Sequence, residues 1–182
     1  MGAHTEARRP ESRRRHGTRD ARVRAALDAL RRIVQALRLS AARAKRHTGL
    51  SGAQLFVLQQ LADQPAQSLN ELAQRTRTHQ SSVSTVVTRL VGRGLVSRRR
   101  ADEDGRRLLL ELTPDGRDLL SGAPETAQSR LIAALERLPQ SQLTTLASTL
   151  EGLVAALGVE TQPAQLFFEA PEDPGPSGRA RR

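Results

Sequence analysis

The fold is decided by residues 68–113, which read SLNELAQRTRTHQSSVSTVVTRLVGRGLVSRRRADEDGRRLLLELT. A Ser-x-x-Glu capping box at Ser68–Glu71 predicts the start of a short helix. After a tight turn, the spacing predicts a second helix over 78–92, and alternating residues predict a β-hairpin over 95–113. Between Ser68 and Arg100 there are seven arginines and a single acid. So positive a surface favours a nucleic-acid backbone over a small metabolite.

The helix predicted over 78–92 has two contrasting faces. Its inner face carries four apolar residues at the i, i+3, i+4, i+7 spacing of a buried stripe, namely Val83, Val86, Val87 and Leu90. Its outer face offers hydroxyls, threonine methyls and one guanidinium, which are groups that read base edges in the major groove. The candidate DNA contacts on this helix are Gln80, Ser81, Ser82, Ser84, Thr85, Thr88 and Arg89.

The helix pair by itself leaves two interpretations open. A helix-turn-helix that binds DNA has this pattern, and so does an ordinary helical hairpin with a polar outer face. Arg77 stands at a turn position where glycine is often found, and a left-handed backbone there has an energetic cost. His79 is predicted to project toward the inner side, where either a phosphate contact or local packing fits.

The hairpin that follows, here called the wing, favours DNA. Its second strand alternates over 107–113, and Asp104-Gly105 supplies a tight turn at the tip. An arginine beside such a tip can enter a minor groove, and a neighbouring acid can orient it by a bidentate pair. We assign these roles to Arg106 and Asp104, with Asp102 as the substitute acid; a surface salt bridge without a ligand is the alternative. The candidate wing contacts are Arg98, Arg99, Asp104, Arg106 and Arg107.

Helices are predicted on both sides of this unit. From Val23 the apolar residues recur at steps of three and four, which predicts a long first helix. A second heptad stripe predicts a last helix over 139–157, which Gly158 closes. Between them, Ser51 caps a helix, and Thr113-Pro114 begins a segment that is broken at residues 122–124. The wide stripes fit a subunit interface, although packing within one subunit explains them too.

Composition limits the classes of protein that remain. The 182 residues suffice for one domain with a real core, and the formal charge of +10 favours a polyanion as partner, nucleic acid ahead of an anionic membrane. The basic charge is almost all arginine, which fits nucleic-acid contact and equally a GC-rich coding sequence. No cysteine is present, so disulfides, thiolate metal sites and cysteine redox sensing are excluded.

Other motifs are missing from the sequence. The four histidines lack compact ligand spacing, so no metal site is expected. There is no phosphate loop, nucleophile elbow or His/carboxylate cluster, and we expect neither an enzyme nor a cofactor. No apolar run approaches the roughly 20 residues of a membrane span, and the basic N-terminus lacks the apolar core of a signal peptide. A soluble, cytoplasmic protein is the expectation.

Taken together, the helices and the wing make the sequence resemble the MarR family of bacterial winged helix-turn-helix regulators. The most specific motifs are Arg93-Gly94-Leu95-Val96 entering the wing, Asp104-Gly105-Arg106-Arg107 within it, and Leu112-Thr113-Pro114-Asp115-Gly116 leaving it. The resemblance covers roughly residues 23–157. It implies a mainly α fold with a small β-hairpin wing (α+β), and a homodimer built by the first helix and the last two, with each winged lobe reading half of a near-palindrome.

The resemblance also implies roles for residues and segments. Ser81, Ser82, Ser84 and Thr85 match the positions that enter the major groove, and Arg106 matches the wing arginine. The expected organisation is a disordered basic arm at 1–19, a first dimerisation helix at 20–47, the winged lobe at 48–113, C-terminal dimerisation helices at 114–158, and a largely disordered tail at 159–182. The arm either touches DNA phosphates or is a solvated tail.

Regulation by a small, often aromatic and acidic ligand is common in that family, with the ligand between the dimer region and the winged lobe. The candidate pocket residues are Arg43, His47 and Phe56, although a histidine at a helix end more often caps it or is solvated. The sequence therefore predicts a dimeric, sequence-specific regulator of double-stranded DNA, more often a repressor than an activator. A sequence-tolerant architectural DNA-binding protein and a winged-helix protein-interaction module are the alternatives.

Overall fold

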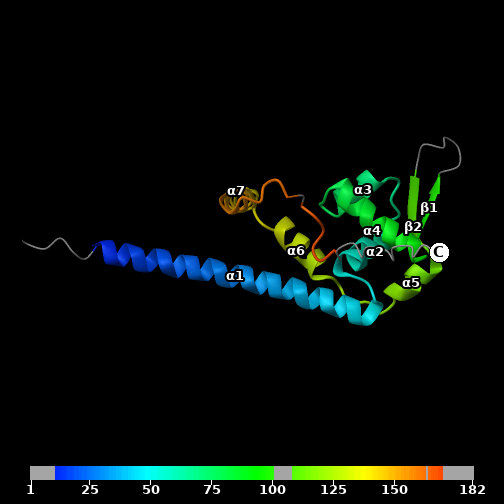
Figure 1. Ribbon diagram of the computed structural model, residues 1–182, viewed down its shortest axis with the longest axis horizontal. Helices are drawn as coiled ribbons and strands as arrows, with labels where there is room; N and C mark the ends of the chain where they lie inside the picture. The colour runs from blue at the N-terminus through cyan, green and yellow to red at the C-terminus, as the bar shows by residue number, and fades with distance from the viewer. Residues whose placement is uncertain (1–10, 101–107, 163, 170–182) are drawn as a thin grey trace, which may run out of the picture. The chain divides into compact units, whose positions relative to one another are not determined.

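The structure is a computed structural model that describes residues 11–100, 108–162 and 164–169 (Figure 1). The chain divides into two compact units, residues 1–36 and 37–182. Most of the elements are helices, and two strands form one small antiparallel sheet. The predicted mainly α fold with a β-hairpin is confirmed.

The first helix, α1 (Glu11–Thr48), begins earlier than its predicted start at residue 20. The prediction of a disordered arm is therefore wrong for 11–19, and residues 1–10 lie outside the described residues. Arginine is a good helix former, and a helix that has already nucleated extends with one hydrogen bond for each residue added. Within the first unit, α1 leaves its apolar stripe exposed, and Val23, Leu27 and Leu30 are each at least 40% accessible.

The winged lobe begins with α2 (Gly52–Asp63), α3 (Leu69–Arg75) and α4 (Gln80–Gly92). Ser51 caps α2 as predicted, since its hydroxyl accepts the Gln54 amide and the Gln54 side chain accepts the Ser51 amide. The inner face of α4 is buried as predicted, against the apolar side chains of α2 and α3. These apolar contacts fix the direction in which the outer face of α4 points.

The wing is made by β1 (Val96–Arg100) and β2 (Leu108–Leu112), with Val96 opposite Leu112. Leu110 is fully buried beneath the sheet, and it exchanges two backbone hydrogen bonds with Ala66, of 2.8 and 2.9 Å. Ala66, in the segment before α3, thus forms an isolated antiparallel bridge to β2 of this two-stranded sheet. The base of the wing is fixed to the core by these bonds and by the side chain of Leu110.

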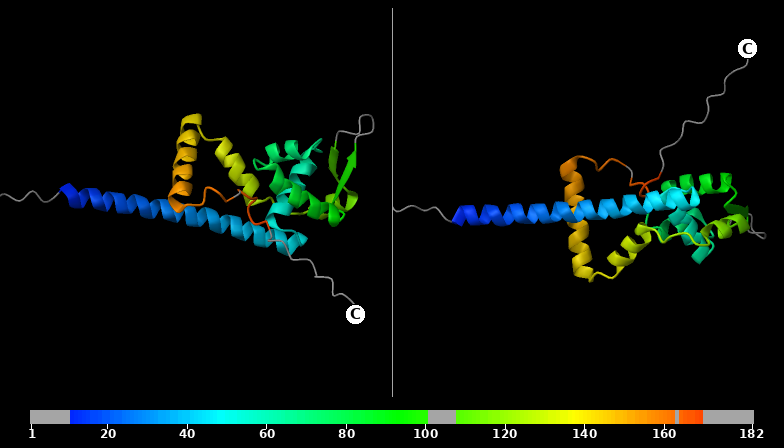
Figure 2. Two further views of the ribbon diagram at one scale, coloured as in Figure 1. Left: turned by 45° about the horizontal axis from the view of Figure 1, so that its top comes forward. Right: turned by 90° about the horizontal axis from the view of Figure 1, so that it is seen from below.

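Three helices follow, α5 (Pro114–Leu120), α6 (Ala127–Glu136) and α7 (Gln140–Leu157). Thr113 caps α5, and the predicted break at residues 122–124 separates α5 from α6. Gly158 ends α7 with a left-handed backbone at φ 66°, also as predicted. Figure 2 shows α7 standing apart from the helices of the winged lobe, and none of its residues is buried.

The chain then returns from α7 to the winged lobe (Figure 1). Leu166 is only 4% exposed and belongs to the main hydrophobic core. Residues 164–169 of the predicted, largely disordered tail thus have a place in the fold, while 170–182 lie outside the described residues and the disorder expected there stays a prediction. The cluster of Leu166 with Phe167 and Phe168 is the signal that favours packing, because a polar tail offers nothing to bury.

Candidate nucleic-acid interface

The turn that aims α4 is a helix ending of the Schellman type. The Arg77 amide donates to the Gln74 carbonyl (3.1 Å), and the Thr78 amide donates to the Ala73 carbonyl (3.0 Å). Arg77 has a left-handed backbone at φ 53°, a conformation that has an energetic cost for a residue other than glycine. The buried hydroxyl of Thr76 donates to the Leu72 carbonyl (2.8 Å). The turn therefore depends on backbone bonds rather than on a glycine.

The outer face of α4 is exposed to solvent. Ser81 and Thr88 are exposed, and Ser84 and Thr85 are partly exposed. Two of the hydroxyls donate within the helix, Thr85 to the Ser81 carbonyl (3.2 Å) and Thr88 to the Ser84 carbonyl (2.8 Å). Each hydroxyl keeps its acceptor lone pairs and each threonine its methyl, so this face can accept from amino groups and contact a thymine methyl.

The position of Ser82 differs from the one that the sequence predicts. The sequence pattern predicts an outer position for it, but Ser82 is only 8% exposed and its hydroxyl donates to the Ala164 carbonyl at 3.5 Å. Ser82 lies about 100° around the helix from Ser81, at the flank where residues 164–169 pack. Periodicity could not separate the two serines, because the packing partner is far away in the sequence.

The residues near the two ends of α4 have different surroundings from the middle of its outer face. His79, the N-cap, is exposed rather than turned inward, and Gln80 beside it is exposed too. Arg89 is partly buried, and its Nη1 lies 3.9 Å from Oε1 of Glu169. Glu169 is a neighbour of the candidate site that the sequence did not indicate.

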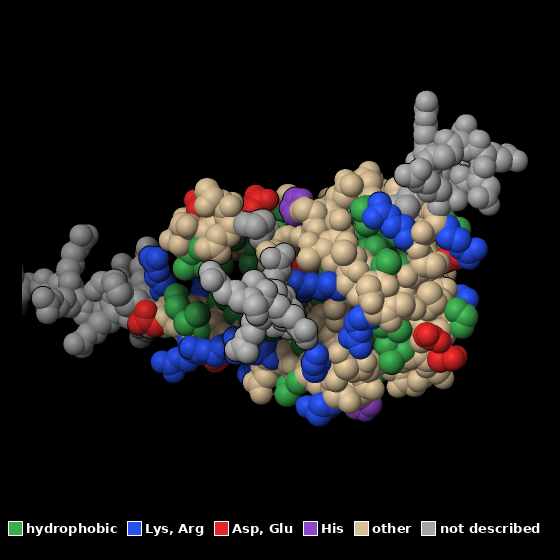
Figure 3. All heavy atoms as spheres, turned by 45° about the vertical axis from the view of Figure 1, so that its right-hand side comes forward, with side chains coloured by type: hydrophobic (Ala, Val, Ile, Leu, Met, Phe, Trp, Pro, Cys, Tyr) green, Lys and Arg blue, Asp and Glu red, His purple; other side chains and the backbone are tan. Residues whose placement is uncertain are grey.

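The base of the wing presents arginines at the sheet surface. Arg98 and Arg99 are exposed, and Arg99 forms an ion pair with Glu111 of the opposite strand. The tip residues Asp102, Asp104, Arg106 and Arg107 lie outside the described residues, so their predicted roles stay predictions. Figure 3 shows that Lys and Arg side chains form several small groups over the face in view, separated by neutral and apolar surface.

The predicted ligand-pocket residues do not gather. Arg43 and His47 are exposed on the last turns of α1, and His47 donates Nδ1–H to the Arg43 carbonyl (3.0 Å). Phe56 is 1% exposed and is part of the core, so its prediction as a pocket wall is wrong. Its place on the inner face of α2 explains this, because an aromatic ring fills the space between packed helices.

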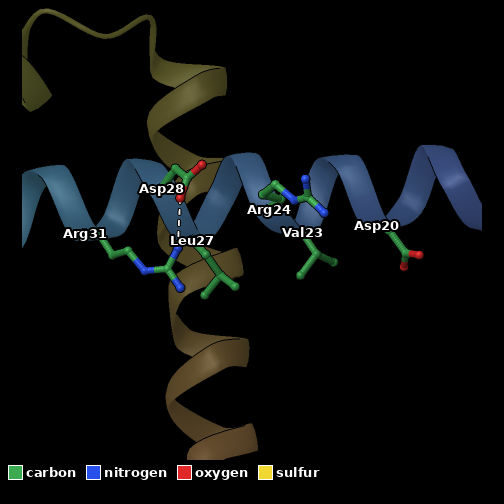
Figure 4. A pocket seen from close by; sticks show the side chains of 6 residues that line it. All are labelled: Asp20, Val23, Arg24, Leu27, Asp28 and Arg31. Carbon is green, nitrogen blue, oxygen red and sulfur yellow. Dashed lines mark hydrogen bonds and ion pairs between the residues drawn. The ribbon is translucent and has the colours of Figure 1, made fainter.

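A shallow hollow on the first unit is the surface of a single helix (Figure 4). It is lined by Asp20, Val23, Arg24, Leu27, Asp28 and Arg31. Val23 and Leu27 project from the same side of α1, and Arg31 pairs with Asp28 at 2.8 Å. Within the part of the chain that the structure describes, no group of three or more His, Asp or Glu side chains is placed to hold a metal ion. In that same part, no helix is long and apolar enough to span a bilayer.

Comparison with known proteins gives a consistent result. Residues 48–107, which include the whole of α2, α3 and α4, match the sequence model of the MarR family. A probable transcriptional regulator from Pseudomonas aeruginosa is 35% identical, with 68% of this chain and 91% of that chain covered and a TM-score of 0.44. BpsR from Bordetella bronchiseptica, whose DNA binding is regulated by 6-hydroxynicotinic acid, is 27% identical over 69% of this chain and 90% of its own (TM-score 0.45).

A third similar structure is Sco3205 from Streptomyces coelicolor, a MarR family transcriptional regulator solved in complex with DNA. It is 22% identical, with 82% of this chain and 94% of its own covered and a TM-score of 0.48. No curated protein matches the chain. The fold and the exposed face of α4 define a winged helix-turn-helix DNA-binding protein. This chain belongs to the MarR family, whose members are transcriptional regulators and not enzymes.

Proposed function

We propose that this regulator is a homodimer that reads a near-palindromic operator in double-stranded DNA and represses transcription until a small ligand releases it. The observation that carries the proposal is the outer face of α4, where Ser81, Ser84, Thr85 and Thr88 remain accessible while the opposite face is buried. A helix held in this way can lie in a major groove with its hydroxyls and methyls against base edges.

The wing supplies the second contact. Arg98 and Arg99 at its base are exposed, and they suit phosphate oxygens. Arg106 is assigned to an adjacent minor groove, with Asp104 holding its guanidinium and Arg107 contacting the backbone. Gln80 and Arg89 complete the set on α4. In this arrangement α4 makes most of the contacts that read the base sequence. The wing makes most of the contacts that fix the position of the protein on the duplex.

The dimer is inferred from apolar surface that the chain leaves uncovered. Val23, Leu27, Leu30, Ile33 and Val34 are exposed on α1, and so are Leu150, Leu153, Val154 and Leu157 on α7. An amphipathic helix gains most of its stability from burying its apolar face. A second copy of the chain offers the same stripes and satisfies both helices. Such pairing also places two copies of α4 on one duplex, as a near-palindrome requires.

For the ligand response, Arg43 and His47 remain the candidate contacts. Both are exposed on α1. A guanidinium pairs with a carboxylate through two parallel hydrogen bonds, which suits an aromatic acid. Relief of repression then requires that the ligand binds the DNA-free form more tightly than the DNA-bound form.

The test is selection of bound duplexes from a random pool by the full chain, with and without phenolic acids. We expect a near-palindromic consensus with half-sites about one helical turn, roughly 10 base pairs, apart. A specific-to-nonspecific affinity ratio near one at physiological salt contradicts the proposal and favours a sequence-tolerant architectural protein. Failure to bind any duplex at low salt favours a protein-interaction module.

Thr85→Val sharpens this experiment, because it keeps the shape and one methyl but removes the hydroxyl. We expect a changed base preference at one position of each half-site, worth about 1–3 kcal/mol between bases. The matched control is Thr144→Val in α7, where the hydroxyl also donates to a backbone carbonyl four residues earlier (2.9 Å). If both variants select the wild-type consensus, α4 does not read bases through Thr85.

A further inference from the structure

Residues 164–169, here called the strap, pack along one flank of α4. The Ala164 carbonyl accepts the Ser82 hydroxyl at 3.5 Å, and Glu169 Oε1 lies 3.9 Å from Arg89 Nη1. Between these two contacts Leu166 is buried in the core. The Glu169 amide donates to the Leu166 carbonyl at 3.2 Å, which closes a turn at the end of the strap.

The two contact points on α4 are seven residues apart. Seven residues make almost two full turns, so Ser82 and Arg89 lie on the same flank, separated by about 10 Å along the axis. Ser81, Thr85 and Thr88 lie further around the helix and remain accessible. The strap therefore covers one edge of the candidate reading surface and leaves its centre open.

The chemistry of the covered edge resembles that of a DNA contact. Arg89 is the one cationic side chain among the candidate contacts on α4, and the side chain of Glu169 beside it is only 9% exposed. A carboxylate next to a guanidinium occupies the position that a phosphate oxygen or a base acceptor takes in a complex. The strap also has a left-handed residue, Phe168 at φ 57°, so its contacts hold a backbone conformation that costs energy.

We propose that the strap is an autoinhibitory element that competes with DNA for Arg89. The inference rests on the proposed reading role of α4 and adds a regulatory step to it. In the closed form Glu169 neutralises Arg89 and the strap fills the flank of α4. DNA binding displaces Glu169, and the phosphate or base takes its place at the guanidinium. The apparent affinity is then reduced by the fraction of molecules whose strap is closed.

The direct test is Glu169→Gln in the full chain, measured by fluorescence anisotropy with the duplex that the wild-type chain selects. Loss of the charge weakens the closed form, and we expect the Kd to fall by about two- to fivefold, the range of a partly exposed ion pair. Glu160→Gln is the matched control. It removes one negative charge from the same region, at an exposed residue outside the strap, and its effect is to be smaller than twofold.

A second measurement separates competition from a simple change of net charge. In an Arg89→Gln background, Glu169→Gln is expected to leave the Kd unchanged, because the guanidinium for which the carboxylate competes with DNA is gone. Hydrogen exchange of the Leu166–Glu169 amides is expected to speed up when duplex is added to the wild-type chain. Protection that stays equal or rises on adding DNA overturns the strap as a competitor.

Two affinity results also overturn the proposal. In the first, Glu169→Gln weakens DNA binding as much as Arg89→Gln does, and Glu169 is then a residue that positions the guanidinium for DNA. In the second, the Kd of Glu169→Gln equals that of the control Glu160→Gln, and the change in affinity is then only an effect of net charge. The proposed function fails differently, since a wild-type chain that prefers no duplex, or a Thr85→Val variant with unchanged base preference, refutes base reading by α4 whatever Glu169 does.

Discussion

At the scale of single residues, the winged lobe depends on a close approach between α5 and Leu95, the residue that precedes β1 of the wing. A Cβ atom added at Gly116 would lie 2.2 Å from the carbonyl oxygen of Leu95. That same oxygen accepts the Thr113 amide at 3.2 Å, so it cannot move away without losing a bond. Gly116 is required here for space, and the contact sets how α5 meets the wing.

We expect Gly116→Ala to lower the free energy of unfolding by about 1–3 kcal/mol, because the methyl group meets backbone rather than a mobile side chain. Gly152→Ala is the matched control, since nothing lies within 4 Å of its added Cβ inside α7. That change is expected to raise the stability by about 0.5–1 kcal/mol. Urea unfolding followed by circular dichroism measures both, and equal effects of the two changes contradict the close-approach argument.

Residue types alone predict some of these roles and not others. Arg77 has a left-handed backbone at a position where the sequence indicates only that such a backbone has an energetic cost. Ser82 and Phe56 were assigned wrongly, because hydrophobic period tells which side of a helix is buried but not how wide the covered sector is. Arg106 and Asp104 stay predictions from sequence.

At the scale of elements, short helices depend on their ends. α3 has only seven residues, too few to be stable through propagation alone. The predicted capping box is half confirmed, because the Ser68 hydroxyl accepts the Glu71 amide (3.0 Å) while the Glu71 carboxylate accepts the Gln67 amide (2.7 Å) instead of that of Ser68. The Glu71 carboxylate thus fixes the backbone of Gln67, the residue before the N-cap. Together the two hydrogen bonds hold the first turn of α3, the helix that packs against α4.

Ser68→Ala is expected to lower the free energy of unfolding by about 1 kcal/mol, because the first turn of α3 loses its acceptor. Ser68→Asp is the conservative comparison and should retain most of the stability, since a carboxylate caps as well as a hydroxyl. Asn70→Ala, at an exposed first-turn residue, tests for general effects of substitution in this turn. Thermal unfolding at one protein concentration ranks the three, and a Ser68→Asp variant no better than Ser68→Ala speaks against the cap.

The helices and the hairpin could be predicted because their signals are local. Periodicity located α4 and the strands, and Thr113-Pro114, Gly158 and the break at 122–124 marked ends that the structure confirms. The start of α1 could not be predicted from the same signals. Its arginine-rich first turns have no apolar pattern, and helix propensity is what extends them.

At the scale of the whole molecule, the sequence could not reveal which distant segments meet. The strap reaches the flank of α4 across more than eighty residues of sequence, through Ser82 and Ala164. A few apolar residues in a polar tail were the only hint, and they do not specify the surface that they cover. The apolar stripes on α1 and α7 are the reverse case. The sequence pattern predicts them clearly, but within the part of a single chain that the structure describes, no segment covers them.

If a second copy covers α7, a charge in the middle of its stripe must break the assembly. Leu153 is 46% exposed in the single chain, so Leu153→Glu costs the folded monomer little, yet it places an unpaired carboxylate in an apolar interface. We expect sedimentation equilibrium to show a dimer for the wild-type chain and mainly monomer for the variant. Ser148→Glu is the matched control, because it adds the same charge on the opposite side of α7, and it should remain dimeric.

The two variants should also separate on DNA. A monomer can contact only one half-site, so Leu153→Glu is expected to bind the selected duplex at least tenfold more weakly, because the contribution of the second half-site is lost. Its affinity for a duplex that holds a single half-site should match that of the wild-type protein for the same duplex, which shows that α4 itself is intact. A Leu153→Glu protein that stays dimeric with full operator affinity would place the dimer interface elsewhere and leave the apolar stripe of α7 without a partner.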